Sequence, residues 1–229
     1  MAGPPVLLVH GFASSFERNW REPGWVDLLS DAGREVIGLD LLGHGSADKP
    51  HDPEAYADLE DDVAAALPED PSVQVDAIGF SMGAILLLKV AAKHPDRFNR
   101  IIVGGIGANV FGGGGSEAIA KAVEGGVDSE SSAIARVFAQ FAAGSDNDPK
   151  ALAACMRRQS TPLTADDLAR ITCPVLVVLG DKDFVWPPDP LVDALPDATL
   201  VTLAGVDHFA TPREFKFIDA ALDFLGASI

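Results

Sequence analysis

The sequence predicts an α/β fold in which helices cover both faces of a mostly parallel β-sheet. Short apolar segments alternate with helical patterns along most of the 229 residues. These segments are apolar almost throughout, which is typical of parallel strands buried on both faces. With 48% hydrophobic residues, the chain is long enough to form one complete core.

Each predicted strand is a short apolar run between turn residues. The first run, for example, lies between Pro5 and Gly11, and the second ends in a glycine-bracketed turn from Asp40 to Gly45. The predicted strands are residues 6–9, 35–39, 73–78, 101–103, 174–179 and 198–203.

Helical patterns follow most of these runs. An amphipathic pattern predicts helices over residues 23–32 and 56–67, whereas residues 81–94 are apolar nearly all round. That helix should therefore pack on the sheet and be covered on its other side. Thr164 begins a capping-box-like helix start, and residues 212–225 predict a closing helix.

Residues 104–163 differ in character from the rest of the chain. They are rich in glycine, alanine, serine and aspartate, and they include a tetraglycine at 112–115. Helical spacing predicts a helix over 132–143, and Asp148-Pro149 predicts the start of another. We expect residues 1–103 and 164–229 to form the core, and residues 104–163 to be an insertion that folds over the end of the sheet as a small helical lid.

The composition narrows the possible partners. A net charge of −17 disfavours nucleic acid and anionic membranes. No basic leader or membrane-length apolar run is present, and the two cysteines, Cys155 and Cys173, fit a reducing compartment, so we expect a cytoplasmic protein. No Cys/His cluster has metal-ligand spacing, so we expect no metal site. The sequence does not indicate the oligomeric state.

The stretch Gly79-Phe80-Ser81-Met82-Gly83 lies between a predicted strand and a predicted helix. Small residues two positions either side of Ser81 allow the two backbones to approach closely. Ser81 is then expected to adopt strained backbone geometry that lifts its hydroxyl clear of the sheet, as in a nucleophile elbow. The alternative is an ordinary glycine-rich turn with a solvated serine.

Two further polar groups follow predicted strands. Asp181 and Asp183 come after residues 174–179, and Asp207-His208 comes after residues 198–203. Ligands of open parallel sheets bind at these strand ends. The chain order of serine, acid and histidine is the order associated with serine nucleophiles on this type of sheet.

These motifs together resemble the α/β-hydrolase family over essentially the whole chain. The matching motifs are the oxyanion loop His10-Gly11-Phe12, the turn from Asp40 to Gly45, the elbow around Ser81, the acid loop Gly180-Asp181-Lys182-Asp183 with Pro187, and the histidine loop Asp207-His208. Family members usually begin with an antiparallel hairpin that this chain lacks, so the resemblance implies a shortened sheet of about six strands. Asp207 stands where the family usually has glycine, which adds a negative charge near the histidine.

The resemblance also implies roles for these residues. Ser81 would be the nucleophile, His208 its base, and Asp183 the acid that orients the histidine, with Asp181 as the rival acid. The backbone N–H groups of Phe12 and Met82 would form the oxyanion hole. No cofactor is implied.

The remaining histidines and the aromatic residues have simpler interpretations. We expect His10 and His44 to be structural, and His51 and His94 to lie on the surface. Aromatic residues that are candidates for lining an apolar substrate pocket are Phe184, Trp186, Phe209 and Phe138, together with Phe111 and Phe141. Core packing is the alternative for each of them.

The expected function is hydrolysis of a small, largely apolar carboxylic ester through an acyl-enzyme. The same residues would also serve a lactonase, a carbon–carbon bond hydrolase, or a cofactor-free haloperoxidase that forms peracids. A non-catalytic small-molecule binder is a further alternative. Ser81 in place of an aspartate argues against haloalkane dehalogenase and epoxide hydrolase chemistry.

Overall fold

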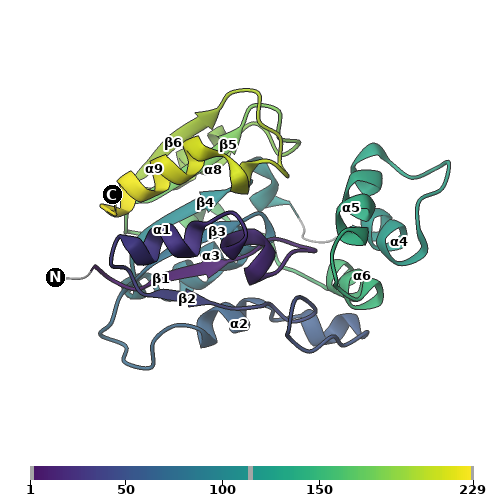
Figure 1. Cartoon of the computed structure of the whole chain (residues 1–229), viewed down its shortest axis with the longest axis horizontal. Helices are drawn as coiled ribbons and strands as arrows, with labels where there is room; N and C mark the ends of the chain where they lie inside the picture. Colours follow the sequence, from purple (N-terminus) through teal and green to yellow (C-terminus); the bar gives the residue numbers. More distant parts are fainter. Residues whose placement is uncertain (1–2, 113–115, 228–229) are drawn as a thin grey trace.

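The computed structural model describes residues 3–112 and 116–227. Within these residues, six parallel strands form one sheet in the order β2-β1-β3-β4-β5-β6 (Figure 1). The strands are β1 (Val6–Val9), β2 (Val36–Gly38), β3 (Val75–Phe80), β4 (Phe98–Gly104), β5 (Val175–Gly180) and β6 (Ala198–Leu203). The predicted α/β class and the shortened parallel sheet are confirmed.

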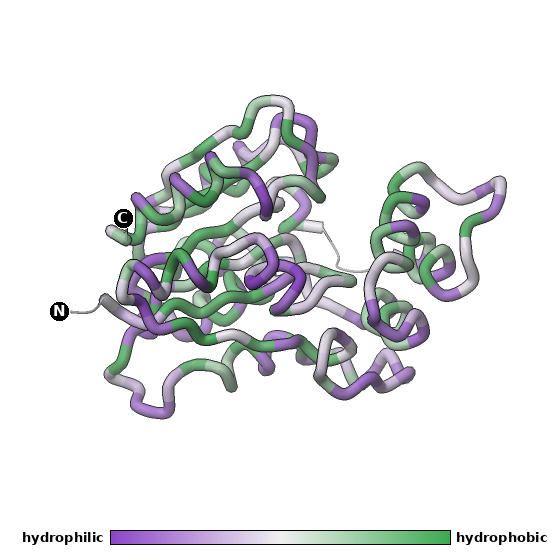
Figure 2. The backbone as a smooth tube through the Cα atoms, in the orientation of Figure 1, coloured by the Kyte–Doolittle hydropathy of each residue, from purple (hydrophilic) through white to green (hydrophobic). Residues whose placement is uncertain are grey.

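Helices cover both faces of this sheet, as apolar, fully buried strands such as β1 and β5 require. The helices of the core are α1 (Trp25–Asp31), α2 (Glu60–Ala65), α3 (Met82–Lys93), α7 (Ala165–Leu168), α8 (Asp189–Ala194) and α9 (Phe215–Leu225). Alternate residues of β1 supply two separate apolar clusters: Leu7 joins the cluster under α2 and α3, and Leu8 joins the one under α1 and α9. Figure 2 shows the apolar residues concentrated along the central strands.

Two predicted helices are shorter than expected. Of the helix expected over 56–67 only α2 is helical, and Tyr56 instead ends a 3₁₀ turn, Pro53–Tyr56, in which its buried side chain donates its hydroxyl to Pro50 O at 2.7 Å. The closing helix α9 begins at Phe215, after a 3₁₀ turn at Thr211–Arg213, because Glu214 has extended backbone geometry. The capping box at Thr164 is present, with reciprocal bonds between Thr164 and Asp167.

Residues 104–163 contribute α4 (Glu117–Gly125), α5 (Ala133–Ala143) and α6 (Pro149–Arg157). The expected helix over 132–143 and the one starting at Asp148-Pro149 are both present, whereas α4, capped by Ser116, was not predicted. Figure 1 shows these helices gathered beside the carboxyl ends of the strands. Residues 113–115 of the tetraglycine lie outside the described residues. The division into core and lid stays a prediction.

Asn147 is one of the residues that connect this helical group to the core. Asn147 accepts a hydrogen bond from Gly45 N at 2.8 Å and donates one to Ser14 O at 3.0 Å.

No helix in the described part of the chain combines the length and the apolar character that crossing a bilayer requires.

Candidate active site

Ser81 is the single residue between β3 and α3. Its φ of 51° and ψ of −118° put a non-glycine residue in the left-handed region, which is strained. The N–H of Ser81 donates to Gly104 O at 2.8 Å, on the neighbouring strand β4, and this bond helps to hold the turn. The serine therefore stands at the apex of a sharp strand-to-helix turn, as its flanking glycines predict.

The two flanking glycines are required by close backbone contacts. A Cβ atom on Gly79 would lie 2.7 Å from Ala84 Cα, and one on Gly83 would overlap the carbonyl oxygen of His10. Both contacts are with backbone atoms, which cannot rotate away. Any side chain at either position would push α3 away from the sheet and displace Ser81.

Three side chains from three strand ends form a hydrogen-bonded chain. His208 Nε2 lies 2.9 Å from Ser81 Oγ, and His208 Nδ1 lies 2.8 Å from Asp183 Oδ2. An ionised carboxylate can only accept, so the Asp183 contact places the histidine proton on Nδ1 and leaves Nε2 as the acceptor for the serine hydroxyl.

The structure separates the two rival acids. Asp183 is 4% exposed, and its second oxygen accepts the Val185 N–H at 3.0 Å. Asp181 instead accepts the Gly205 N–H at 2.7 Å and makes no bond to His208. Asp207, the residue that departs from the family pattern, is exposed and accepts the Ala210 N–H at 2.9 Å, so its carboxylate is used in a turn.

Aromatic rings surround the histidine. The ring centroids of Phe184, Phe80 and Phe209 lie 4.5, 5.0 and 5.3 Å from that of His208. With this cover the histidine is only 3% exposed. Such a setting excludes water and strengthens the electrostatic interaction between His208 and Asp183.

The loop after β1 carries the Phe12 N–H and packs against the turn that holds the serine. A Cβ atom on Gly11 would lie 3.3 Å from Ser81 Cβ, so this loop runs directly past Ser81. Gly11 O accepts from His10 Nδ1 at 2.8 Å and from Ser14 N at 3.3 Å. Because C=O and N–H of a trans peptide point in opposite directions, these bonds aim the Phe12 N–H away from the His10 ring.

Two backbone donors beside Ser81 have no partner. Neither the Phe12 N–H nor the Met82 N–H donates to an acceptor among the described residues. Met82 is the first residue of α3, where the N–H groups are free and the helix dipole favours negative charge. The two donors predicted from the sequence are thus both available to an oxyanion.

The family model of the alpha/beta hydrolase family matches residues 6–217. The chain belongs to the α/β-hydrolase family. A haloalkane dehalogenase from Mycolicibacterium paratuberculosis is 33% identical over 110 residues, which is 44% of this chain and 33% of that protein. A 2-hydroxymuconate semialdehyde hydrolase from a Pseudomonas species is 31% identical over 107 residues, 45% of this chain and 37% of that protein. The matches thus span about a third of the length of these relatives.

The similarity in fold extends over most of a solved structure. The enol-lactonase from Burkholderia xenovorans LB400 has a TM-score of 0.78 at 23% identity, and the match covers 99% of this chain and 92% of that one. At this identity the likeness shows the α/β-hydrolase fold.

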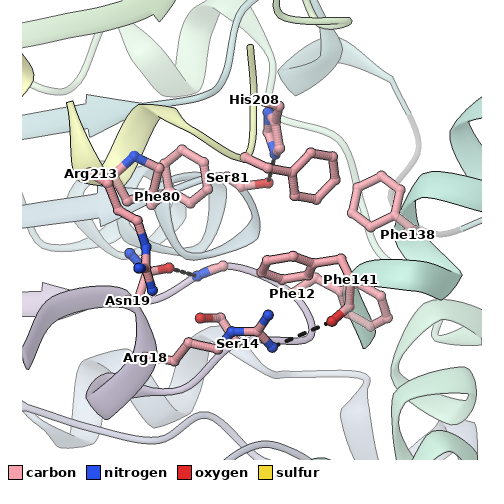
Figure 3. A pocket seen from close by; sticks show the side chains of 13 residues that line it. Phe12, Ser14, Arg18, Asn19, Phe80, Ser81, Phe138, Phe141, His208 and Arg213 are labelled. Atoms are coloured by element: carbon pink, nitrogen blue, oxygen red, sulfur yellow. Dashed lines mark hydrogen bonds between the residues drawn. The ribbon is translucent and has the colours of Figure 1, made fainter. Parts of the chain in front are cut away.

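Two cavities of this α/β-hydrolase meet at Ser81. The larger, of about 320 Å³, is drawn in Figure 3, and the smaller has about 210 Å³. Phe12, Phe138 and His208 line both cavities. Apolar or aromatic residues that line only the larger one include Phe80, Phe141, Phe209 and Pro212, and those that line only the smaller one include Ile85, Leu86, Ile119, Ile134 and Phe184.

The predicted pocket residues divide into two groups. Phe138, Phe209 and Phe184 line one or both cavities, whereas Trp186 lines neither and is 43% exposed. Ser14 and Arg18 also line the larger cavity, and neither was predicted from the sequence as a pocket residue. A five-residue π-helix at Glu17–Arg21 positions Arg18, and no sequence pattern identified that turn.

The other predicted non-catalytic residues are accounted for by their surroundings. His10 and His44 are both fully buried, and burial lowers the pKa of each, to about 3 for His44. Burial raises the pKa of the Cys155 and Cys173 thiols to about 11, so neither is a thiolate nucleophile at neutral pH. Among residues 3–112 and 116–227, no cluster of three or more His, Cys, Asp or Glu is arranged to hold a metal ion.

Proposed function

We propose that this α/β-hydrolase cleaves a carboxylic ester through an acyl-enzyme formed on Ser81. The observation that carries the proposal is the hydrogen-bonded chain from Ser81 Oγ through His208 to Asp183, with contacts of 2.9 and 2.8 Å. A serine hydroxyl is a weak nucleophile by itself, and a base within hydrogen-bond distance makes it competent.

Each residue has a defined part in the proposed reaction. His208 Nε2 takes the hydroxyl proton as Ser81 Oγ bonds to the ester carbon. The carbonyl oxygen becomes an oxyanion, to which the N–H groups of Phe12 and Met82 donate. The C–O bond of the ester then breaks, and His208 passes its proton to the departing alcohol. A water molecule repeats the sequence on the acyl-enzyme and releases the acid.

Asp183 is the proposed partner of the imidazolium. When His208 holds a second proton, the buried carboxylate 2.8 Å from Nδ1 stabilises the positive charge. Asp181 is not proposed for this part because its carboxylate already accepts the Gly205 N–H.

The cavities support a substrate with apolar parts. Phenylalanine side chains line both of them next to Ser81. Phe138 and Phe141 come from α5, so we propose that residues 104–163 act as the lid of this site. The net charge of −17 argues against a nucleic-acid partner, and the two free, buried cysteines support a cytoplasmic location.

Halide displacement is not part of the proposal, although one relative is a haloalkane dehalogenase. Attack of Ser81 on an alkyl halide would leave an alkyl ether on the serine, which water does not cleave. Lactones use the same acyl chemistry as esters and remain alternative substrates of the proposed site.

The test is an assay of wild type and Ser81→Ala on p-nitrophenyl esters from acetyl to octanoyl. We expect turnover in the wild type, a loss of at least about 10⁴-fold in Ser81→Ala, and an acyl adduct on Ser81 by mass spectrometry. Ser72→Ala is the matched control, because Ser72 is exposed and bonds only to Asp70. Equal activity in Ser81→Ala and wild type would overturn the proposal.

A further inference from the structure

The larger cavity has a polar wall opposite its phenylalanine-rich part. Figure 3 shows Ser14 and Arg18 on the side of the cavity that faces away from His208. Ser14 is 4% exposed, and its backbone is fully used: the N–H donates to Gly11 O and the carbonyl accepts from Asn147. Its hydroxyl has no partner among the described residues. A cavity-lining hydroxyl without a partner in the protein is a donor available to a ligand.

Arg18 is half-buried beside Ser14 and lines the same cavity. Its guanidinium carbon lies 4.3 Å from the centroid of the Phe141 ring, and Nη1 donates to Phe141 O over a long 3.4 Å. That bond uses one of its five N–H donors. No carboxylate in the described part of the chain forms an ion pair with it.

The lack of a counter-ion is specific to Arg18 on this face. Arg21, on the same π-helix, pairs with Glu17 at 3.0 Å, and Arg213, which also lines the cavity, pairs with Glu22 at 2.9 Å. Glu17 and Glu22, two acids close to Arg18, are therefore already paired with other arginines. A partly desolvated guanidinium is stabilised by an anion, and here the cavity is the space in which one fits.

We propose that Arg18 and Ser14 bind a carboxylate of the substrate while its ester group lies at Ser81. This inference rests on the proposed function and names its substrate class: an ester that carries a carboxylate beyond a short apolar segment, such as a monoester of a dicarboxylic acid. The planar guanidinium matches a carboxylate with two parallel hydrogen bonds, and the Ser14 hydroxyl supplies a third. The apolar segment packs between Phe12, Phe138 and Phe141. The substrate is then apolar only in the segment between its ester group and its carboxylate, and not largely apolar as the sequence led us to expect.

Arg158 is the competing cation. It is 8% exposed and lines the smaller cavity, but its Nη1 donates to Cys155 O at 2.7 Å at the carboxyl end of α6. That short bond and the negative end of the helix dipole compensate its charge in the protein itself. We therefore assign the carboxylate to Arg18, and the experiment includes both arginines.

The test compares monomethyl adipate with methyl hexanoate, which have the same six-carbon acyl chain and differ by a terminal carboxylate. The kcat/KM of each ester is measured by pH-stat titration for wild type, Arg18→Gln, Arg158→Gln and the control Arg21→Gln. We expect Arg18→Gln to lower the ratio of charged to neutral kcat/KM by about 10- to 100-fold, mainly through KM of the charged ester. Ser14→Ala should lower it by about 3- to 10-fold, and Arg21→Gln should leave it unchanged. Thermal unfolding verifies that each variant is folded.

A binding measurement separates this inference from the proposed function. Calorimetry on Ser81→Ala, alone and combined with Arg18→Gln, gives the affinity for monomethyl adipate without turnover. Arg18-dependent binding together with no ester turnover in the wild type would overturn the proposed function and support the anion site. Ser81-dependent turnover with a ratio that Arg18→Gln does not change would overturn the anion site alone. A ratio that falls in Arg158→Gln and not in Arg18→Gln would also overturn it, because the carboxylate then lies in the smaller cavity.

Discussion

His10 donates its Nδ1–H to the carbonyl oxygen of Gly11 over 2.8 Å and thereby holds the peptide that carries the Phe12 N–H. The other ring nitrogen, Nε2, accepts the Leu41 N–H at 3.1 Å. These two bonds require the neutral ring with its proton on Nδ1. Burial favours that form, because it lowers the pKa of His10 below 6.5. The histidine predicted to be structural thus has a positioning role next to the proposed oxyanion hole.

Replacing His10 by alanine should loosen this peptide. We expect His10→Ala to lower kcat for p-nitrophenyl esters by about 10- to 100-fold, with a smaller change in KM, because the donor acts mainly on the transition state. Steady-state kinetics measure the split, and circular dichroism verifies the fold. The control is His94→Ala, an exposed histidine. An unchanged kcat would show that Gly11 is held without His10.

The buried His44 makes stability depend on pH. Its pKa is lowered from 6.5 to about 3, mainly by burial, so the folded state stays neutral where the unfolded state takes up a proton. Its contribution is fully present above pH 6.5 and is lost as pH falls from 6.5 toward 3, by about 1.4 kcal/mol per pH unit.

Urea unfolding of wild type and His44→Gln at pH 7.5 and pH 5 tests this dependence. We expect the free energy of unfolding of the wild type to fall about 2 kcal/mol more than that of the variant between these pH values. Because both proteins contain the same carboxylates, the contribution of these groups to the pH dependence of stability cancels in the comparison. Parallel losses in the two proteins would contradict the assignment to His44. The exposed His94 provides the control His94→Gln.

The two aspartates of the acid loop should differ sharply in their effect on rate. Asp183→Asn removes the carboxylate that fixes the His208 tautomer, and kcat should fall by about 10³- to 10⁴-fold. Asp181→Asn weakens only a turn at Gly205 and should change kcat less than about threefold. Initial rates on a p-nitrophenyl ester measure both. The reverse order would make Asp181 the catalytic acid.

Glycine at 83 should be required for stability as well as for the position of Ser81. Gly83→Ala puts a methyl group onto the carbonyl oxygen of His10, and we expect the free energy of unfolding to fall by about 1–3 kcal/mol. Gly125→Ala is the matched control at the end of α4, where a Cβ atom meets nothing within 4 Å. It should raise the free energy by about 0.5–1 kcal/mol. Urea denaturation measures both changes.

The sequence contains most of the information that sets the sheet and the Ser81 turn. Strand runs and glycine spacing are local patterns, so the order of the elements and the elbow follow from them. The position of Arg18 does not, because it depends on a π-helix whose direction is set by packing of the buried Trp20 against Trp25, with ring centroids 5.4 Å apart.

The two aromatic residues of the acid loop show why residue type alone was insufficient to predict the pocket. Phe184 lines the smaller cavity, whereas Trp186, two positions later, lines neither cavity and is 43% exposed. Between them the chain turns, and the Trp186 N–H donates to Asp183 O at 3.2 Å. The direction of each side chain is set by this turn, which the sequence pattern did not specify.

The site is assembled from distant parts of the chain. Ser81 and His208 are 127 positions apart, and Asp183 is 25 positions from His208, yet all three meet because β3, β5 and β6 end at the same edge of the sheet. No fragment that lacks either β3 or β6 can hold the three side chains together. Turnover is therefore a reporter of the intact sheet: a nick or truncation that releases either strand should abolish activity even where much of the helical content survives.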